Sequence, residues 1–361
     1  MKILVDAFGG DNAPEEIVNA SLLALFKHKD LKITLVGKAD VIQDCLVGKK
    51  YDQARLDMID AREVIGCDEP PVEAIRTKKD SSIVRAVETL KEKPDEYCAF
   101  VSAGSTGALL SATILKLGRI RGVNRPVLAP LLPTIKGTPV MLVDSGANMD
   151  ARASNLVQFA MLAHVYMHKV LGIEKPRVAL LNVGVEEAKG NELTKEVYPL
   201  LKALPLNFVG NMEARDFLSG EYDIVVADGF SGNVLLKSTE GACKILMQEI
   251  KQAIMGSFMS KIGGLFIKGS IKELKQKFDY ESFGGSVLLG AKGVVVKAHG
   301  STKAKGFLAA IEQAMAIGQS NINEVIEKEF EKMASIEHLQ EKAEATQQIQ
   351  ESLKDKQNQE G

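Results

Sequence analysis

The chain has 361 residues, 45% of them hydrophobic and 25% charged, and its 45 basic and 47 acidic residues give a net charge of −2. This balance is typical of a globular protein with a large core and argues against nucleic acid as a partner. No apolar run reaches the roughly 18 residues of a membrane-spanning helix, and no signal-peptide segment precedes Asp6, so we expect a cytoplasmic protein.

Short apolar runs alternate with helical patterns along the chain, which is typical of βαβ units that form a largely parallel sheet with helices on both faces. Helices are predicted after Pro14 and over 39–46. No linker or repeat divides the first 335 residues, so we expect one catalytic domain over 1–335 and a charged, disordered tail over 336–361. Strands are predicted at Lys2–Val5, Leu31–Val36, Leu56–Ile59, Tyr97–Val101, Val127–Leu132, Val140–Val143, Val178–Asn182, Asp223–Val226 and Val294–Val296.

Nearly every predicted strand ends in a cluster of Gly, Asp, Asn or Ser. Ligands of open α/β sheets bind beyond the carboxyl ends of the strands, and glycine lets the backbone approach an anion closely. The loops over 6–14 and 102–107 therefore predict a phosphate cradle that ends at the start of a helix. The alternative for each loop is that Gly and Ser only turn the chain and cap the next helix.

Nucleotide-binding and hydrolase motifs match poorly. The chain has no G-x-G-x-x-G, and 285–292 lacks the spacing and the Ser or Thr of a P-loop, so no nucleotide is predicted. Ser105 lies at the centre of a relaxed nucleophile elbow, but a hydrolase triad would need His299 as its base. We therefore favour phosphate binding over a triad at this loop.

Metal-binding patterns are also incomplete. His164 and His168 lie four residues apart on a predicted helix, but the Glu of H-E-x-x-H is missing, so packing or surface roles are expected. The four cysteines are far apart and form no C-x-x-C motif. Neither a metal site nor a disulfide framework is predicted.

Four further strand-end loops carry groups suited to act on a substrate. Lys189, in 182–192, is placed either to meet a phosphate or an anionic leaving group, or to form a solvated charged turn. His299, in 297–302, is the histidine most expected to act, because its loop is rich in Gly and Ser. The other two loops are 144–148 and 228–233.

Residues 244–277 contain seven lysines against Glu249 and Glu273. Between the lysines lies a glycine-interrupted run of large apolar residues, which predicts a helical hairpin over 244–279 that rests on an anionic membrane surface. The alternative is a hairpin that packs on a dimer partner or on the body. The side chains expected at the membrane are Ile254, Met255, Phe258, Met259, Ile262, Leu265 and Phe266.

Six segments in collinear order resemble one family, the phosphate acyltransferases of bacterial phospholipid synthesis, or PlsX family. The resemblance covers about residues 1–335, and Phe8 and Asn12 depart from the Met and His that we associate with the family. The segments are DAFGGDNAP (6–14), SAGSTGALL (102–110), DSGAN (144–148), NVGVEEAKGNEL (182–193), ADGFSGNVLLKSTEG (227–241) and KAHGSTKAKG (297–306).

The resemblance implies transfer of a long-chain fatty-acyl group from acyl carrier protein to inorganic phosphate, giving the acyl phosphate that a membrane glycerol-3-phosphate acyltransferase consumes. It implies a homodimer without a metal or nucleotide cofactor, and the basic apolar segment adds the expectation of peripheral association with the inner face of the cell membrane. The implied fold is a three-layer α/β/α arrangement with a mixed, mostly parallel sheet, similar to isocitrate and isopropylmalate dehydrogenases. The alternatives are a phosphotransacetylase-like enzyme that uses acyl-CoA, and a non-enzymatic membrane scaffold of lipid synthesis.

Roles for individual residues follow from loop position within this resemblance. Asn233 is expected to orient or polarise the thioester, and Lys189 and His299 to manage developing charge. The residues expected to hold phosphate are Ser105, Thr106 and Gly107, and those expected to bind substrate or to order these groups are Asp6, Gly9, Gly10, Asp11, Asp144, Asn148, Asp228 and Ser231.

Overall fold

The apolar run that opens the chain forms strand β1 (Lys2–Asp6), and the residues after Pro14 form helix α1 (Glu15–Lys27). The alternation of strand and helix continues through the computed structural model, which describes residues 1–278 and 283–332. The remaining strands are β2 (Lys32–Gly37), β3 (Leu56–Asp60), β4 (Ala99–Ser102), β5 (Val127–Leu132), β6 (Val140–Val143), β7 (Arg177–Asn182), β8 (Asn207–Glu213), β9 (Ile224–Val226), β10 (Ser286–Leu289) and β11 (Val294–Lys297). The remaining α-helices with both ends among the described residues are α2 (Ala39–Leu46), α3 (Pro71–Thr77), α4 (Ser82–Glu92), α5 (Thr106–Ala112), α6 (Ala153–Lys169), α7 (Glu192–Ala203), α8 (Gly229–Met255), α9 (Phe258–Lys277) and α10 (Ala304–Gln319).

The described strands form one 11-stranded sheet in the order β3-β2-β1-β4-β11-β10-β5-β6-β9-β7-β8. The first five strands are parallel to one another, and so are the last four. Strands β10 and β5 join these groups through three successive antiparallel pairs. The two parallel groups therefore run in opposite directions.

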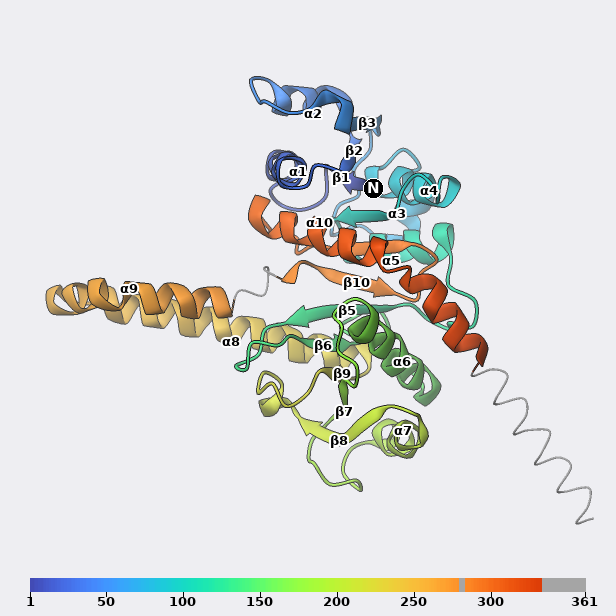
Figure 1. Cartoon of the computed structure of the whole chain (residues 1–361), viewed down its shortest axis with the longest axis vertical. Coiled ribbons are helices and arrows are strands. Elements are labelled where there is room, and N and C mark those ends of the chain that lie inside the picture. Colours follow the sequence, from blue (N-terminus) through green and yellow to red (C-terminus); the bar gives the residue numbers. More distant parts are fainter. Residues whose placement is uncertain (279–282, 333–361) are drawn as a thin grey trace, which may run out of the picture.

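Alternate side chains of each strand point into two helical layers, because successive residues of a strand face opposite sides. Ile3 and Val5 pack in the cluster covered by α1, α6, α7 and α10, whereas Leu4 packs with α3, α4 and α5 on the other face. Leu142 and Val225 continue this second face and pack against α8. Figure 1 shows helices on both sides of the sheet. The predicted three-layer α/β class with a mixed, mostly parallel sheet is confirmed.

Every strand predicted from the sequence is present, and β5 and β6 begin and end at the predicted residues. The prediction omits β8 and β10. Strand β8 lies at the edge of the sheet with Asn207 and Val209 exposed, so its apolar signal is weak. The four residues of β10 follow two glycines and precede a third, a pattern typical of a loop, although they are paired on both sides within the sheet.

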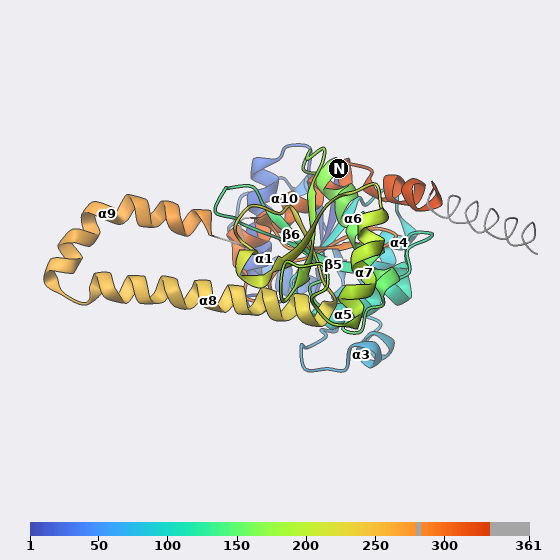
Figure 2. The same cartoon turned by 90° about the horizontal axis from the view of Figure 1, so that it is seen from below.

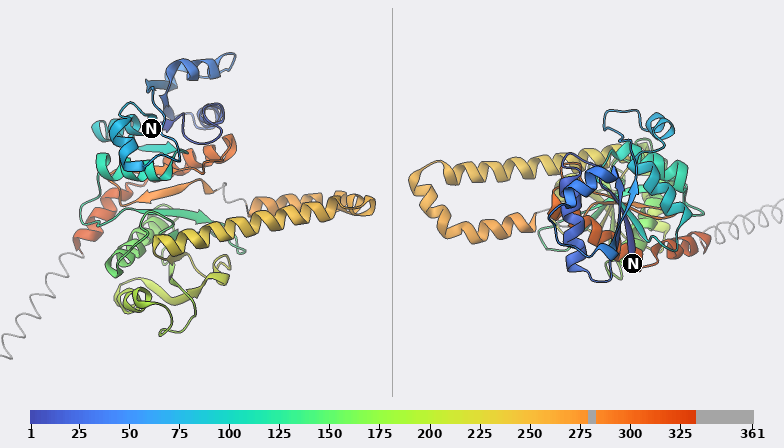
Figure 3. Two further views of the ribbon diagram at one scale, coloured as in Figure 1. Left: turned by 180° about the vertical axis from the view of Figure 1, so that it is seen from behind. Right: turned by 90° about the horizontal axis from the view of Figure 1, so that it is seen from above.

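Helices α8 and α9 form a helical hairpin that projects from the body (Figures 2 and 3). Gly264 of α9 lies against Ile254 of α8 so closely that a Cβ at Gly264 would overlap this side chain, which fixes the distance between the helices near the tip. The predicted boundary of the hairpin at residue 279 and the predicted tail over 336–361 lie outside the described residues. In the described part of the chain, no helix is long and apolar enough to cross a bilayer.

Candidate active site

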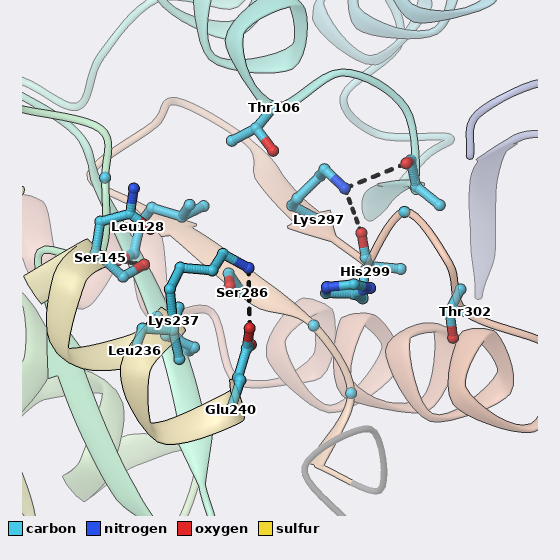
Figure 4. A pocket seen from close by; sticks show the side chains of 18 of the residues that line it. Thr106, Leu128, Ser145, Leu236, Lys237, Glu240, Ser286, Lys297, His299 and Thr302 are labelled. Atoms are coloured by element: carbon cyan, nitrogen blue, oxygen red, sulfur yellow. Dashed lines mark hydrogen bonds and ion pairs between the residues drawn. The ribbon is translucent and has the colours of Figure 1, made fainter. Parts of the chain in front are cut away.

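A cavity of about 440 Å³ opens on the face of the sheet between α5 and α8. Strands β5, β10 and β11, which lie side by side where the two parallel groups meet, form its floor. Figure 4 shows side chains from both groups around this space. Because the two groups run in opposite directions, their loops meet across the face of the sheet and not at one common edge.

The loops after β1 and β11 are bound to each other. The N–H of Asp11 donates to the carbonyl of Gly300 at 2.8 Å, and the side-chain amide of Asn12 donates to two further carbonyls of the same loop. Gly10 has a φ of +94°, and a Cβ there would lie 2.7 Å from the Gly300 oxygen. Glycine is therefore required at this contact, which holds the loop over 298–302 at the cavity.

Asp6 ends β1 and is fully buried. Its carboxylate accepts hydrogen bonds from the Ser102 hydroxyl at 2.6 Å and from the Phe8 N–H at 3.1 Å. The Ser102 oxygen accepts in turn from the N–H of Gly104 at 3.0 Å. Burial raises the pKa of Asp6 above its ordinary value. Asp6 therefore orders the turn after β4 from behind the cavity wall.

The loop after β6 is built around the buried carboxylate of Asp144. Three successive backbone N–H groups, those of 146–148, donate to it at 2.6 to 3.2 Å, and the N–H of Leu128 donates at 3.1 Å. The side-chain amide of Asn148 adds a further bond at 3.0 Å. These bonds satisfy the buried carboxylate and fix the loop so that Ser145 faces the cavity.

Helix α8 begins beside this loop. Asp228 caps the helix by accepting hydrogen bonds from both the N–H and the hydroxyl of Ser231 at 2.8 Å. Gly232 lies against the carbonyl of Asp144 so closely that a Cβ would overlap its oxygen. This close packing places Asn233, the next residue, in the cavity lining.

Lys297 ends β11 and is 9% exposed, with its side chain in the cavity. Its ammonium donates to the carbonyls of Ala103, at 3.2 Å, and of Ala298 (Figure 4). Within 1–278 and 283–332, no carboxylate forms an ion pair with this ammonium. Burial lowers the pKa of Lys297 to about 8, although Cys67 and Asp6 nearby favour the charged form.

His299 lies beside Lys297 in the same view (Figure 4). Its Nδ1 accepts the N–H of Ser301 at 3.3 Å and lies 2.9 Å from the hydroxyl of the same residue. Since Nδ1 is an acceptor, the proton of the neutral ring is assigned to Nε2. Burial lowers the pKa of His299 below its ordinary value. At neutral pH the ring is therefore a neutral N–H donor.

Lys237 and Glu240 form an ion pair on α8, with 2.9 Å between Nζ and Oε2. Together with His299 they also line a second cavity, of about 530 Å³, along α8. Met247 and Phe278 contribute apolar surface to this second cavity, and Lys244 and Lys275 add positive charge beside Lys237. The ion pair therefore stands where the two cavities meet, and the second cavity is the more basic of the two.

Of the residues predicted to act on substrate, Thr106, Gly107, Asn233 and His299 line the 440 Å³ cavity. Ser105 caps α5 instead, because its hydroxyl accepts the N–H of Ala108 at 3.4 Å. The remaining predicted residues form the framework behind the lining: Asp6, Gly9, Gly10, Asp11, Asp144, Asn148, Asp228 and Ser231.

Lys189 lies on an exposed turn after β7, where its N–H donates to the carbonyl of Glu186 at 3.1 Å. Strand β7 is three strands away from β5, so roughly 14 Å of sheet separates the two. Among the described residues of one chain, this turn does not contribute to the cavity lining. The role of Lys189 in charge management therefore stays a prediction.

Six charged or hydroxyl-bearing residues of the lining have no predicted role: Ser145, Lys237, Glu240, Ser286, Lys297 and Thr302. For Lys297 the sequence does contain a signal, because a lysine closes an otherwise apolar strand of three valines. A lysine at such a position is placed where the buried sheet meets a loop.

The histidine pair lies on α6, with ring centroids 6.4 Å apart and nearly parallel planes. In the part of the chain that the structure describes, no group of three or more His, Cys, Asp or Glu side chains lies together to hold a metal ion. All four cysteines carry free thiols.

Solved structures with a similar fold include phosphotransacetylases. The phosphotransacetylase of Streptococcus pyogenes is similar with a TM-score of 0.58 at 17% identity, covering 89% of this chain and 94% of that chain. A branched-chain phosphotransacylase from Enterococcus faecalis V583 has a TM-score of 0.55 at 14% identity, covering 89% and 100%. The fold is therefore the α/β fold of these proteins.

The family described as fatty acid synthesis protein matches residues 1–325. A phosphate acyltransferase of Clostridium tetani is 46% identical over 330 residues, 91% of this chain and 98% of that protein. A phosphate acyltransferase of Thermoanaerobacter pseudethanolicus is 46% identical over 333 residues, 92% of this chain and 98% of that protein. The chain belongs to this family of phosphate acyltransferases, which confirms the resemblance found in the sequence.

Proposed function

We propose that this protein transfers a long-chain fatty-acyl group from acyl carrier protein to inorganic phosphate and releases acyl phosphate. Acyl transfer to phosphate is the activity for which its relatives are named. The observation that carries the proposal is the meeting of two cavities at Lys237, Glu240 and His299. The first cavity combines polar donors with leucine side chains, and the second adds Met247 and Phe278. A fatty-acyl thioester has a polar reactive carbonyl and a long apolar chain, so a pair of joined cavities suits it.

For this reaction the protein mainly has to position the phosphate and the thioester and to stabilise the charge that develops on them. Phosphate is already anionic and nucleophilic, so the site needs groups that hold it and donors for the thioester oxygen. Thr106 and Lys297 offer donors on one side of the cavity, and the amide of Asn233 and the Nε2–H of His299 offer others. The transfer then needs no covalent acyl-enzyme and no metal.

The test is to mix the purified protein with acyl carrier protein that carries a long-chain fatty-acyl group, with and without phosphate. Acyl phosphate is trapped with hydroxylamine. We expect thioester consumption only when phosphate is present. Consumption without phosphate, or none in either mixture, would refute the proposal, and the second result would leave a non-enzymatic scaffold. Faster reaction with acyl-CoA than with acyl carrier protein would favour the phosphotransacetylase-like alternative.

The tip of the hairpin supports a proposed position at the inner face of the cytoplasmic membrane. Phe258, Met259, Leu265 and Phe266 are between 72% and 85% exposed, and lysines flank them. Exposed aromatic and aliphatic side chains beside lysines suit the boundary between acyl chains and anionic headgroups. Acyl phosphate released there is close to a membrane glycerol-3-phosphate acyltransferase, which is its proposed consumer.

A homodimer is proposed to cover apolar side chains of α8 nearer the body. Phe230 and Val234 are 63% and 51% exposed near the start of α8, and Ile245 and Leu246 are 63% and 61% exposed further along it. Several large apolar side chains exposed along one helix suit burial against a second copy of the chain. Size-exclusion chromatography with light scattering tests this, since a monomer at micromolar concentration would contradict it.

A further inference from the structure

Four polar side chains from four neighbouring strands lie in one row across the sheet. Lys297 of β11 is in register with Ser102 of β4 on one side and with Ser286 of β10 on the other. Asp6 of β1 joins the row through its hydrogen bond with Ser102. The row borders the cavity, while the residues one step back along the same face, such as Leu4, pack in the apolar core.

Lys297 is the buried cation of this row. Two of its three N–H donors are bound to backbone carbonyls, those of Ala103 and Ala298, which leaves one donor for a further acceptor. Lys237, the other lysine of the lining, is exposed and already paired with Glu240. Among the described residues that line the cavity, Lys297 is therefore the ammonium whose charge is balanced by dipoles and not by a bound carboxylate.

We propose that Lys297 is a catalytic residue that contacts the incoming phosphate, and that Asp6 is a positioning residue that acts on it through Ser102 and the Ala103 carbonyl. This inference rests on the proposed function. A buried ammonium without a carboxylate partner is stabilised by an anionic ligand, and inorganic phosphate is the anion of this reaction. Asp6 fixes the 102–104 turn, whose carbonyl orients the ammonium.

Lys297 also accounts for the proton of the reaction. A phosphate oxygen attacks the thioester carbon, so a C–O bond forms, the C–S bond breaks, and the sulfur leaves with the electron pair. The Lys297 ammonium gives its proton to this sulfur and takes back the proton that hydrogen phosphate carried. The sum is thioester plus hydrogen phosphate giving acyl phosphate plus thiol. With its pKa at about 8, Lys297 is well matched to a thiol of ordinary pKa about 8.5.

The first test compares Lys297→Met with the wild type and with Lys292→Met, a control that removes an exposed lysine outside the cavity. We expect Lys297→Met to raise the KM for phosphate about tenfold or more and to lower kcat, with less than a twofold change in the KM for acyl carrier protein. The control keeps all three constants. A folded Lys297→Met with wild-type constants would overturn the inference, whereas wild-type protein without phosphate-dependent activity would overturn the proposed function.

A second measurement needs no variant. Calorimetric titration of the wild type with inorganic phosphate at pH 8.5, in two buffers of different ionisation enthalpy, counts the protons taken up on binding. Lys297 is partly neutral at this pH, so phosphate binding must protonate it, and we expect net proton uptake that disappears at pH 6.5 after correction for phosphate itself. Phosphate binding at pH 8.5 without proton uptake would overturn the inference.

The role of Asp6 needs a measurement that loss of stability alone does not change. Asp6→Asn keeps the shape and can accept from Ser102, but it removes the negative charge near Lys297. We expect the alkaline limb of the pH profile for kcat/KM of phosphate to move to lower pH in this variant. An unchanged alkaline limb in a folded Asp6→Asn would show that Asp6 has no influence on Lys297.

Discussion

The side-chain amide of Asn12 donates to the carbonyl of Ser301 at 3.0 Å, which joins two loops 289 residues apart in sequence. The same amide donates to the carbonyl of Thr302 at 3.1 Å. Asn12 therefore has a structural reason to be at this position, where the sequence departs from the residue that we associate with the family. Its contact holds the His299 loop against the loop after β1.

Replacing Asn12 tests this contact. Asn12→Ala loses both hydrogen bonds. Asn12→Asp also loses them, because a carboxylate cannot donate, although the side chain keeps almost the same shape. We expect each variant to lower the free energy of unfolding by about 1 to 2 kcal/mol and to raise the KM for phosphate. Urea denaturation and steady-state kinetics measure these effects. Asn12→Asp with wild-type stability would show that the loops are held together by other contacts.

Two glycines of α8 allow a matched pair of alanine substitutions. A Cβ at Gly232 would overlap the carbonyl oxygen of Asp144, whereas a Cβ at Gly241 would meet nothing within 4 Å. We expect Gly232→Ala to cost about 2 kcal/mol or more and to reduce turnover, because it pushes Asn233 out of place. Gly241→Ala in the same helix should stabilise the protein by up to about 1 kcal/mol. Equal melting temperatures for the two variants would contradict this account of how α8 is positioned.

Lys297 makes stability depend on pH. Its pKa is lowered from 10.5 to about 8 in the folded protein, so folding favours the neutral form. Above pH 10.5 the lysine is neutral in both the folded and the unfolded state, so its charge does not affect the free energy of unfolding. As the pH falls towards 8, the unfolded chain binds the proton first, and the free energy of unfolding falls by roughly 3 kcal/mol.

Lys297→Met removes this cost, so the variant should be more stable than the wild type at pH 7, by an amount that shrinks as the pH rises from 8 to 10. Denaturant unfolding across this range measures the difference. A difference that stays constant with pH would mean that the effect comes from packing and not from the charge.

If the hairpin tip contacts the membrane, negative charges at the tip should abolish binding to anionic vesicles. Phe258→Glu and Leu265→Glu each place a negative charge where the proposal puts lipid, so both variants should fail to sediment with anionic phospholipid vesicles. Val47→Glu, a change at a 77% exposed apolar residue of the body, is the control and should bind as the wild type does. Dissociation of the dimer or unfolding in the tip variants would favour packing of the tip against protein.

Variants of Asn233 and Lys189 test whether the turn that carries Lys189 belongs to the active site. Asn233 lines the cavity, so Asn233→Ala should lower kcat about a hundredfold through loss of a donor to the thioester oxygen. If Lys189→Ala has a comparable effect, its turn must reach the substrate in the working enzyme. If both variants keep wild-type turnover in a folded protein, the assignment of roles to these loops is wrong.

The sequence predicts the local elements well because β5, β6 and the helix after Pro14 carry strong patterns of their own. It predicts less about the site, since loop position alone does not separate lining from framework. Ser105 and Thr106 are neighbours in one loop, yet one caps a helix and the other faces the cavity. Local pattern cannot make this distinction.

Lys297 was missed for a related reason. Its surroundings are set by the pairing of β11 with β4 and β10, and the residues that hold its ammonium include Ala103, which is 194 residues away in sequence. The strand pattern of β11 predicts burial, and burial of a lysine is informative only when the partners are known. Strand order supplies that information, and a single sequence does not.

The order of the strands also has a consequence for synthesis. Strands β4 and β5 are made early, but the two strands that fill the space between them, β11 and β10, come from residues 286–297. Until these emerge from the ribosome, each half of the sheet has an open edge able to pair wrongly. Folding therefore depends on contacts that are distant in sequence, which makes it slow, and truncation before residue 297 should yield insoluble protein.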